Sequence, residues 1–363
     1  MNFSFIDDEE VEMQGLLNRS IEKWLSRKVP SKGSQNCFEI PVVLNTDIGL
    51  KRSQNQDRVA MIRVGPMGGA RSSSLVAIAV ADGMGGMQNG DKCADLAVSS
   101  FFNALVRYRN YNLASRLRMS FGESNDVVNT FAGGKGGATL TVVAVDGSGR
   151  AIISHVGDTR VYSFGGGKKT SRLTVDDSLE EVVGGHGRDL LQFVGMGEGI
   201  SPHLVDIPTD SVNLAITTDG IHYVNAEALD DVLYHSPDVK TASERIAALS
   251  RWCGSPDNAS SALMEFPPII NFVLAAEENA IEMWDAFGHS SFSEIRVEYG
   301  VREPVVNPKE VRAQGEINTS NKVSKRIKRT RVASSKKMAS EVHDMSVEIN
   351  LGSTSEGGDD RRK

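Results

Sequence analysis

The sequence contains few cysteines and no long hydrophobic run. Its three cysteines lie far apart and form no CxxC pair, so neither a disulfide framework nor a zinc site is indicated. The longest apolar runs, residues 75–81 and 269–276, are far shorter than the roughly 18 residues that a membrane-spanning helix needs. The sequence therefore predicts a protein of a reducing compartment, without a membrane span.

An export signal is also missing. Residues 1–15 are acidic, whereas a secretory signal begins with basic residues followed by an apolar stretch. We therefore expect a cytoplasmic protein. At 363 residues, with 40% hydrophobic and 24% charged residues, the chain is long enough for one large domain or two ordinary ones, and its composition excludes collagen, coiled coil and wholesale disorder.

Negative charge predominates over most of the chain, with one exception. Forty Lys and Arg against 47 Asp and Glu give a net charge of −7, so the chain as a whole is not suited to lie along a polyanion. Residues 321–337 differ, because they hold eight Lys or Arg and no acid. This basic run fits contact with nucleic acid, anionic lipid or an acidic protein, or else a solvated tail, since it lacks interleaved aromatic residues.

Composition divides the chain into four parts. Residues 1–37 are predicted as an N-terminal helical extension that ends in a Ser/Gly/Gln/Asn linker. Residues 38–267 hold short β-branched runs bounded by turn residues, together with amphipathic helical patterns over 93–109 and 113–131. This second part is predicted to be the folded domain.

The C-terminal parts give weaker signals. Residues 268–306 are predicted as an extension with a helix over 271–287 and a strand over 292–299. Residues 307–363 are polar, charged and poor in aromatic residues, so we expect disorder there.

The order of the elements predicts the fold class. Strands mostly follow one another through short turns and helices arrive in pairs, an order typical of antiparallel sheets covered by helices rather than of a parallel βαβ fold. We therefore expect an α+β protein.

Two of the predicted strands end in the same dipeptide. SLVAIAVAD leads into Asp82-Gly83, and NLAITTD leads into Asp219-Gly220. A strand end holds a carboxylate rigidly, and a following glycine lets the backbone approach whatever the carboxylate binds. A single Asp-Gly is more often a plain turn, so the informative observation is that two strand ends match.

Two further aspartates occupy comparable positions. Asp158 follows the strand RAIISHV, and Asp257 precedes another apolar run. Clustered carboxylates with few His or Cys partners select Mg²⁺ or Mn²⁺ over zinc. Two such ions, about 3.5–4 Å apart, turn a bridging water into a nucleophile and stabilise both oxygens of a phosphoryl transfer. The pattern indicates hydrolysis of phosphate esters without a covalent intermediate.

Seven short fragments occur in the order and approximate spacing of a known family. They are RSQNQD at 52–57, ADGMGG at 81–86, GATL at 137–140, HVGDTRVY at 155–162, LTVDDS at 173–178, TDG at 218–220 and DN at 257–258. Together they resemble the metal-dependent type 2C (PPM) serine/threonine protein phosphatases in their bacterial form. The resemblance covers about residues 38–266.

The resemblance implies a fold and a reaction. The fold is a four-layer α/β/β/α sandwich of two antiparallel sheets flanked by helices, with metals at one rim. The reaction is the hydrolysis of phosphoserine and phosphothreonine by direct attack of a water that bridges two divalent metals. The implied partners are a phosphorylated protein substrate and a cognate Ser/Thr kinase.

The resemblance also implies roles for individual residues. Asp82 would bridge the two metals, and the Gly83 carbonyl would bind one of them. Asp219 and Asp257 would complete the other. Arg52 would hold the substrate phosphate, for which a planar bidentate donor is suited.

Four further positions take outer roles. Asp158 matches an aspartate that in some members helps bind a third, weaker metal; the alternative is a turn residue that pairs with Arg160. Asp57 and Asn258 would orient waters beside the ligands. Gln56 stands where many members have a glutamate, so it would approach the second metal through a water.

The sequence departs from the family at two possible proton donors. Met84 and Met87 stand where eukaryotic and bacterial members often have histidines. Either a metal-bound water protonates the leaving alkoxide, or a histidine such as His155 or His222 does so. These departures leave a second interpretation open, a catalytically weak pseudophosphatase or phosphoprotein-binding regulatory module.

The segment between residues 178 and 218 is short for the family. Bacterial members usually carry a flap here that helps choose substrates. A reduced flap predicts an open metal rim and little selectivity among small aryl phosphates. Preference for one phosphoprotein would then require docking elsewhere on the surface.

Overall fold

Two antiparallel sheets form the centre of the molecule. The computed structural model describes residues 8–35, 40–66, 73–84, 89–184, 189–208 and 210–293. The six-stranded sheet contains, in spatial order, β1 (Lys32–Gln35), β2 (Val42–Asp47), β11 (Ala259–Glu265), β10 (Asn213–Thr217), β7 (Arg160–Gly165) and β8 (Lys168–Arg172). The seven-stranded sheet contains β13 (Gly288–Ser293), β12 (Ala280–Asp285), β3 (Asp57–Val64), β4 (Leu75–Asp82), β5 (Leu140–Asp146), β6 (Ala151–Val156) and β9 (His203–Asp206).

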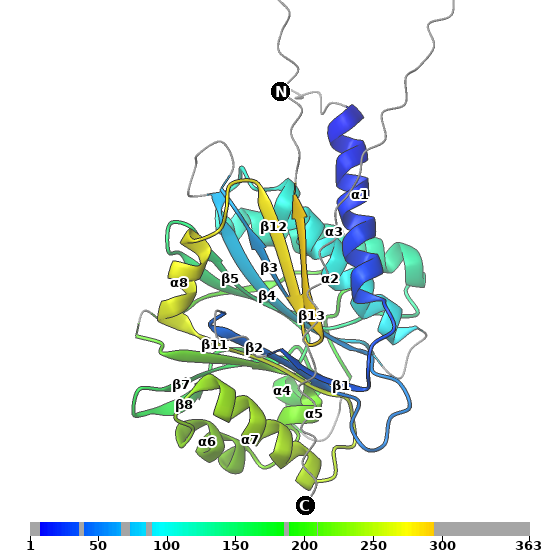
Figure 1. Cartoon of the computed structure of the whole chain (residues 1–363). Coiled ribbons are helices and arrows are strands. Elements are labelled where there is room, and N and C mark those ends of the chain that lie inside the picture. The colour runs from blue at the N-terminus through cyan, green and yellow to red at the C-terminus, as the bar shows by residue number, and fades with distance from the viewer. Residues whose placement is uncertain are drawn as a thin grey trace, which may run out of the picture. The chain divides into compact units, whose positions relative to one another are not determined.

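Helices cover the outer faces of both sheets (Figure 1). The seven-stranded sheet is covered by α1 (Asp8–Leu25), α2 (Gly90–Arg107) and α3 (Leu113–Ala132). The six-stranded sheet is covered by α5 (Asp219–His222), α6 (Ala226–Tyr234) and α7 (Val239–Trp252). Helix α4 (Leu179–Val183) lies in the connection from β8 to β9, and α8 (Phe266–Leu274) packs into the core between the sheets. The predicted α/β/β/α sandwich and α+β class are confirmed.

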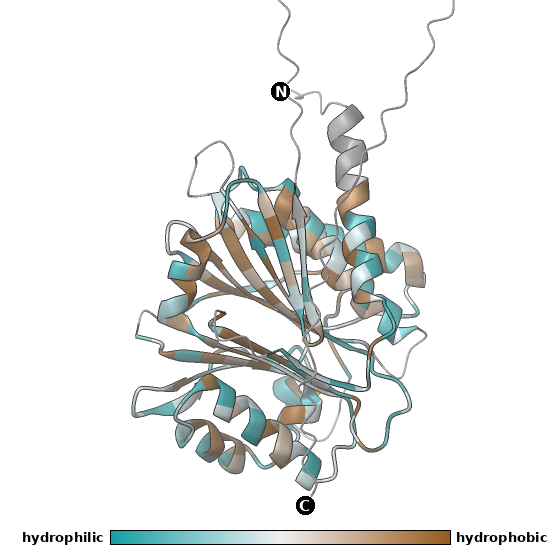
Figure 2. Cartoon of the chain, in the orientation of Figure 1, coloured by the Kyte–Doolittle hydropathy of each residue, from teal (hydrophilic) through white to brown (hydrophobic). Residues whose placement is uncertain are grey.

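Strand β4 shows why the sequence folds into layers. Every residue from Leu75 to Ala81 is fully buried. Side chains alternate along a strand, so Ala77 and Ala79 face the helices of the outer layer, whereas Val76 and Ile78 face the other sheet. Figure 2 shows hydrophobic residues along the strands and more hydrophilic ones on the outer helices. An apolar run without polar alternation is what a strand buried on both faces needs.

Capping residues fix where the helices begin. Asn112 precedes α3, and its Oδ1 accepts a hydrogen bond from Ser115 N at 3.0 Å. Asp238 precedes α7 and accepts from Thr241 N at 2.7 Å. Such caps satisfy backbone N–H groups of the first turn that have no partner inside the helix.

The N-terminal residues form more than a helix and a linker. Helix α1 is present as predicted, and its Ile21, Trp24 and Leu25 are buried in the core shared with α2. The predicted linker is wrong at β1, which pairs with β2 in the register Lys32↔Asp47. Gly33 permits this pairing, because a Cβ there would come within 2.3 Å of the Phe287 ring.

The predicted helix over 271–287 is wrong for most of its length. Helix α8 ends at Leu274, and the residues that follow form the hairpin of β12 and β13. Strand β12 pairs with β3 over Ile281↔Val64 to Asp285↔Ala60. Its backbone groups therefore find partners in the sheet, which a sequence window cannot reveal. The seven-stranded sheet extends beyond residue 267, where the domain was expected to end.

Several expectations concern residues outside the described ranges. They are the strand predicted to begin at residue 292, beyond Ser293, the disordered tail over 307–363 and the basic run 321–337. Among the described residues, no helix is long and apolar enough to cross a membrane.

Candidate active site

One rim of the sandwich collects the ends of strands from both sheets. Antiparallel register pairs Asp57, the first residue of β3, with Asp82, the last of β4. In the six-stranded sheet, Thr217 at the end of β10 pairs with Arg160 at the start of β7 and with Ser261 near the start of β11. The segments that carry Asp158, Asp219 and Asp257 adjoin these ends. The register thus brings together aspartates that are up to 200 residues apart.

Asp82 and Gly83 are held by the backbone of neighbouring segments. Asp82 N donates to Thr139 Oγ1 at 2.9 Å, and Thr139 N donates to Asp82 O at 2.9 Å. Gly83 N donates to Gln56 O at 3.2 Å. A Cβ on Gly83 would lie 2.2 Å from Gly90 O and 2.8 Å from Gln56 O. The close approach of three backbone segments therefore requires glycine at this position.

Asp57 connects the two sheets beneath the rim. Its Oδ2 accepts a hydrogen bond from Thr218 Oγ1 at 3.0 Å. Its Oδ1 is buried without a hydrogen-bond partner among the described residues. Burial, assisted by the nearby Asp219 carboxylate, raises the pKa of Asp57 to about 7. An acceptor held in this way is poised for a donor or a cation that arrives from the rim.

Carboxylates at the rim destabilise one another's charge. Withdrawal from water raises the pKa of Asp82 well above its usual value, and Asp57, Asp219, Asp158 and Asp257 raise it further. Withdrawal from water and the Asp219 charge raise the pKa of Asp158 to about 7. Like charges without a counter-ion disfavour ionisation, so this group of carboxylates favours a cation.

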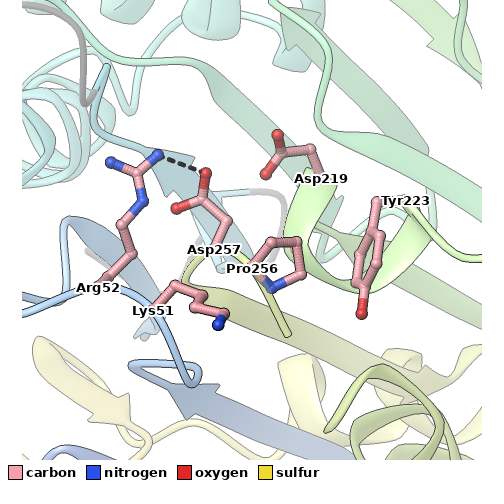
Figure 3. Close-up of a pocket in the computed structure, with 7 residues that line it drawn as sticks. Lys51, Arg52, Asp219, Tyr223, Pro256 and Asp257 are labelled. Atoms are coloured by element: carbon pink, nitrogen blue, oxygen red, sulfur yellow. Dashed lines mark hydrogen bonds and ion pairs between the residues drawn. The ribbon is translucent and has the colours of Figure 1, made fainter. Parts of the chain in front are cut away.

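Arg52 and Asp257 form an ion pair at the mouth of the site. Arg52 Nη2 lies 2.6 Å from Asp257 Oδ2, and Figure 3 shows the two side chains turned toward one another. This hydrogen bond raises the pKa of Arg52, and the charges of Asp257, Asp219 and Asp82 add to it. The guanidinium remains partly exposed, as a group that receives a substrate anion must be.

A cavity of about 320 Å³ opens beside this ion pair. Its lining comes from three segments: the turn after β2, helix α5 and the loop before β11. The lining residues are Lys51, Arg52, Asp219, Gly220, Tyr223, Pro256 and Asp257. Two cationic and two anionic side chains thus share one opening, a combination suited to a phosphate with divalent cations.

Asn258 holds the turn that carries Arg52. Its Nδ2 donates to Ile48 O and Gln54 O, both at 2.9 Å, and its Oδ1 accepts from Gln56 N at 2.8 Å. The side chain is buried, and its amide makes three bonds to one loop. These contacts indicate a positioning role for Asn258, and its predicted part in orienting waters stays a prediction.

The donor set fits a hard divalent cation by its chemistry. Carboxylate and carbonyl oxygens surround the rim. Burial, with mutual repulsion added to it, raises the pKa values of Asp57, Asp82 and Asp158. Among the described residues, no three His, Cys, Asp or Glu side chains converge as a ready metal cluster. The Asp257 carboxylate is bound to Arg52.

The remaining predicted residues have mixed outcomes. Gln56 lies at the rim, where its backbone binds Asn258 and Gly83. Arg160 forms its ion pair with Asp176 at 2.7 Å, and its charge also lowers the pKa of the nearby Asp158. Met87 lies outside the described residues.

Two histidines proposed as proton donors are buried. His155 Nδ1 lies 2.7 Å from Thr141 Oγ1, and its Nε2 lies 3.1 Å from Val175 O. Burial lowers the pKa of His155 to about 4. Burial, with the charges of Arg160 and Arg172, lowers the pKa of His222 well below its usual value. Both rings are neutral near pH 7 and unsuited to donate a proton to a leaving group.

Sequence reasoning missed Lys51 and Tyr223. Tyr223 follows Asp219 by four residues, and its OH donates to Ser250 O at 2.8 Å and accepts from Ser255 N at 2.9 Å. Lys51 directly precedes Arg52 and lines the same cavity. The adjacency of Lys51 and Arg52 was the available signal. The position of Tyr223 depends on how α5 packs on α7.

Comparison with known proteins gives a family match. The family model described as protein phosphatase 2C matches residues 51–265. Protein phosphatase PhpP of Streptococcus pneumoniae serotype 2 is 24% identical over 246 residues, which cover 61% of this chain and 96% of that protein. A putative 2C-type protein phosphatase of Streptococcus pyogenes serotype M6 is 25% identical over 252 residues, with the same shares covered.

Solved structures share the fold. The serine/threonine phosphatase Stp1 of Staphylococcus aureus has a TM-score of 0.53 at 18% identity, with 66% of this chain and 98% of that chain covered. The catalytic domain of the phosphatase PstP, solved with two manganese ions, has a TM-score of 0.50 at 24% identity, with 62% and 96% covered. These likenesses agree with the two-sheet architecture described above.

Proposed function

Since the chain belongs to the protein phosphatase 2C family, we propose that it hydrolyses phosphoserine and phosphothreonine in proteins by direct attack of water. The reaction would use two Mg²⁺ or Mn²⁺ ions at the rim, with Asp158 available for a weaker third. The observation that carries the proposal is the set of carboxylates that raise the pKa of Asp82, beside the exposed Arg52.

The residues at the rim would divide the work of binding the metals and the phosphate. Asp82 and the Gly83 carbonyl would hold one ion, and Asp82, Asp219 and Asp257 the other. Such ions acidify a water and neutralise charge on the phosphoryl oxygens. Arg52 would bind two phosphate oxygens through its planar guanidinium. Asn258 keeps the Arg52 turn in place, and Asp57 fixes β3 against the start of α5.

The physiological substrate would be a phosphoprotein made by a Ser/Thr kinase. The relatives are described as protein phosphatases, and the open, polar cavity is large enough for a phosphorylated side chain. A reduced flap between residues 178 and 218, as the sequence predicts, would leave this cavity accessible.

One experiment tests the proposal. Hydrolysis of p-nitrophenyl phosphate by the full chain is measured with Mn²⁺, with EDTA, and in Asp82→Asn and Asp219→Asn. We expect metal-dependent turnover that EDTA abolishes and that each substitution lowers by at least about a hundredfold, the scale of one charge-stabilising group. The matched control is Asp210→Asn, a surface aspartate bound to Lys168, which should keep full activity.

The opposite result has a definite meaning. If the intact protein binds Mn²⁺ but shows no metal-dependent turnover, the chain is a phosphoprotein-binding module instead of an enzyme.

A further inference from the structure

An exposed tryptophan ends the helix that precedes the cavity-lining loop of Pro256 and Asp257. Trp252, the last residue of α7, is 87% exposed. The other two tryptophans, Trp24 and Trp284, are 7% and 5% exposed. A large aromatic side chain that is left in water costs free energy unless something covers it, and exposed aromatic residues are enriched where proteins bind one another.

A second exposed apolar residue lies on the neighbouring turn. Leu50, which precedes Lys51 and Arg52, is 52% exposed. Its N donates to Ser255 O at 2.9 Å, and Arg251 Nη1 lies 2.6 Å from Asp47 Oδ2. These two bonds join the turn after β2 to the end of α7. The apolar residues therefore stand on two segments that are fixed side by side.

The same two segments line the cavity. Lys51 and Arg52 come from the turn after β2, and Pro256 and Asp257 from the loop that follows α7. Figure 3 shows the Lys51 nitrogen pointing away from the Arg52–Asp257 pair. Lys51 therefore offers positive charge outside the position where Arg52 would hold a phosphate.

We propose that Trp252, Leu50 and Lys51 form a docking surface for the polypeptide on either side of the phosphorylated residue. This proposal rests on the proposed phosphatase function. The occupant is a substrate segment with an apolar side chain, which covers Trp252 and Leu50, and an acidic side chain, which pairs with Lys51. Continuity with the cavity selects the substrate over an unrelated partner, and the Lys51 charge selects an acidic segment over a basic one.

Docking here would supply the selectivity that a reduced flap between residues 178 and 218, as the sequence predicts, would not. A small aryl phosphate reaches Arg52 without touching Trp252, whereas a phosphopeptide extends beyond the cavity. Trp252 and Leu50 should therefore affect KM for peptides and leave the hydrolysis of p-nitrophenyl phosphate unchanged.

The test compares two phosphothreonine peptides on the metal-loaded full chain. One peptide has Leu and Glu on both sides of the phosphothreonine, and the other has Gly and Gln. We expect the first peptide to have a kcat/KM about tenfold higher than the second, because its KM is lower. A tenfold difference is the size expected from one anchoring side chain at an interface. Trp252→Ala should bring the two peptides near to parity, and Lys51→Ala should remove the preference for Glu, with Lys51→Arg restoring it.

The control variant is Tyr234→Ala. Tyr234 is 43% exposed and lies at the far end of the six-stranded sheet, beside Gly165 and Asn213. It should change neither the peptide ratio nor the hydrolysis of p-nitrophenyl phosphate. Because Trp252 has few contacts to lose, its substitution should leave the melting temperature within about 2 °C of the wild type.

A binding measurement keeps docking separate from catalysis. With two of the three tryptophans buried, acrylamide quenching reports mainly on Trp252. The unphosphorylated Leu/Glu peptide should protect Trp252 from quenching. If the peptide protects Trp252 but the protein hydrolyses no substrate, the proposed phosphatase function is rejected and the docking surface is kept. Two results would overturn the docking surface. In the first, Trp252→Ala leaves the ratio of the two peptides' kcat/KM values unchanged, and the peptide does not protect Trp252 from quenching. In the second, Trp252→Ala turns a dimer into monomers, which would assign the surface to a second copy of the chain.

Discussion

At the scale of single residues, the site depends on groups that never touch a substrate. Asn258 makes three bonds to the loop from Ile48 to Gln56, and Arg52 stands in the middle of that loop. Thr218 and Thr139 hold Asp57 and Asp82 in the same manner. A displacement of about 1 Å of a reactive group can lower the rate by up to about a hundredfold, so these supports contribute to the rate without touching the substrate.

Asn258→Ala tests the support of the Arg52 turn. The substitution leaves three backbone groups without their partner, so we expect unfolding free energy to fall by about 1–3 kcal/mol. We also expect kcat/KM for p-nitrophenyl phosphate to fall by about ten- to a hundredfold, because Arg52 loses its position. Denaturant titration and steady-state kinetics measure the two effects.

Asn225→Ala provides the comparison for this variant. Asn225 caps α6 and accepts from Ala228 N at 3.0 Å, so its loss should cost about 1 kcal/mol with unchanged kinetics. If Asn258→Ala behaves like Asn225→Ala, the loop does not depend on the amide.

At the scale of elements, one edge of each sheet comes from an end of the described chain. Strand β1 adds to β2 at one edge, and β12 with β13 adds to β3. Arg27, just after α1, binds Asp285 at the end of β12 through two hydrogen bonds of 2.7 and 3.0 Å. The N-terminal helix and the C-terminal hairpin are thus fastened to one another.

Truncation at residue 267 should therefore fail. A chain that ends there lacks β12, which leaves β3 as an exposed edge and removes the buried Met283 and Trp284. An open apolar edge favours aggregation. We expect this truncated chain to be insoluble or to lack a cooperative thermal transition, whereas a chain that ends at residue 293 should melt like the full protein. Equal melting curves for the two truncations would contradict the structural role of the hairpin.

The sequence predicted the elements whose structure follows from the local pattern of apolar residues. It missed the strands that form because a distant strand pairs with them. The run from Leu75 to Ala81 is apolar and bounded by polar residues, so its strand was evident. β1 has the composition of a linker and β12 lies in a helical pattern, and both are strands because β2 and β3 offer them partners. The same reasoning found Asp82 and Asp219 at strand ends but did not reveal that Asn258 faces the Arg52 loop.

At the scale of the whole molecule, the ionisation of the rim carboxylates makes the unfolding free energy depend on pH. The pKa values of Asp57 and Asp158 are raised to about 7, above those of the unfolded chain. Each group therefore favours the folded state at low pH, and this contribution is lost as pH rises through 7. The lowered pKa values of His155 and His222 act in the opposite sense, but only below about pH 6.5.

Melting temperatures between pH 6.5 and 8 isolate the carboxylates. In EDTA we expect the melting temperature to fall across this range, and Asp158→Asn should reduce the fall. Mn²⁺ should raise the melting temperature more at pH 8 than at pH 6.5, since the cation competes with protons for the same oxygens. A metal-free melting temperature that is constant over the range would argue against the raised pKa values.

The ion pair between Arg52 and Asp257 makes the two halves of the site interdependent. Asp257 cannot bind Arg52 and a cation at full strength, and Arg52 cannot bind Asp257 and a phosphate. A metal that binds Asp257 frees Arg52 for the phosphate, and a phosphate that binds Arg52 frees Asp257 for the metal. Metal and phosphate should therefore bind with positive cooperativity, and thermodynamic linkage makes the gain in affinity equal for both ligands. Calorimetric titration of Mn²⁺ with and without inorganic phosphate would measure it, and the enhancement should be smaller in Arg52→Ala, where only the direct attraction between metal and phosphate remains.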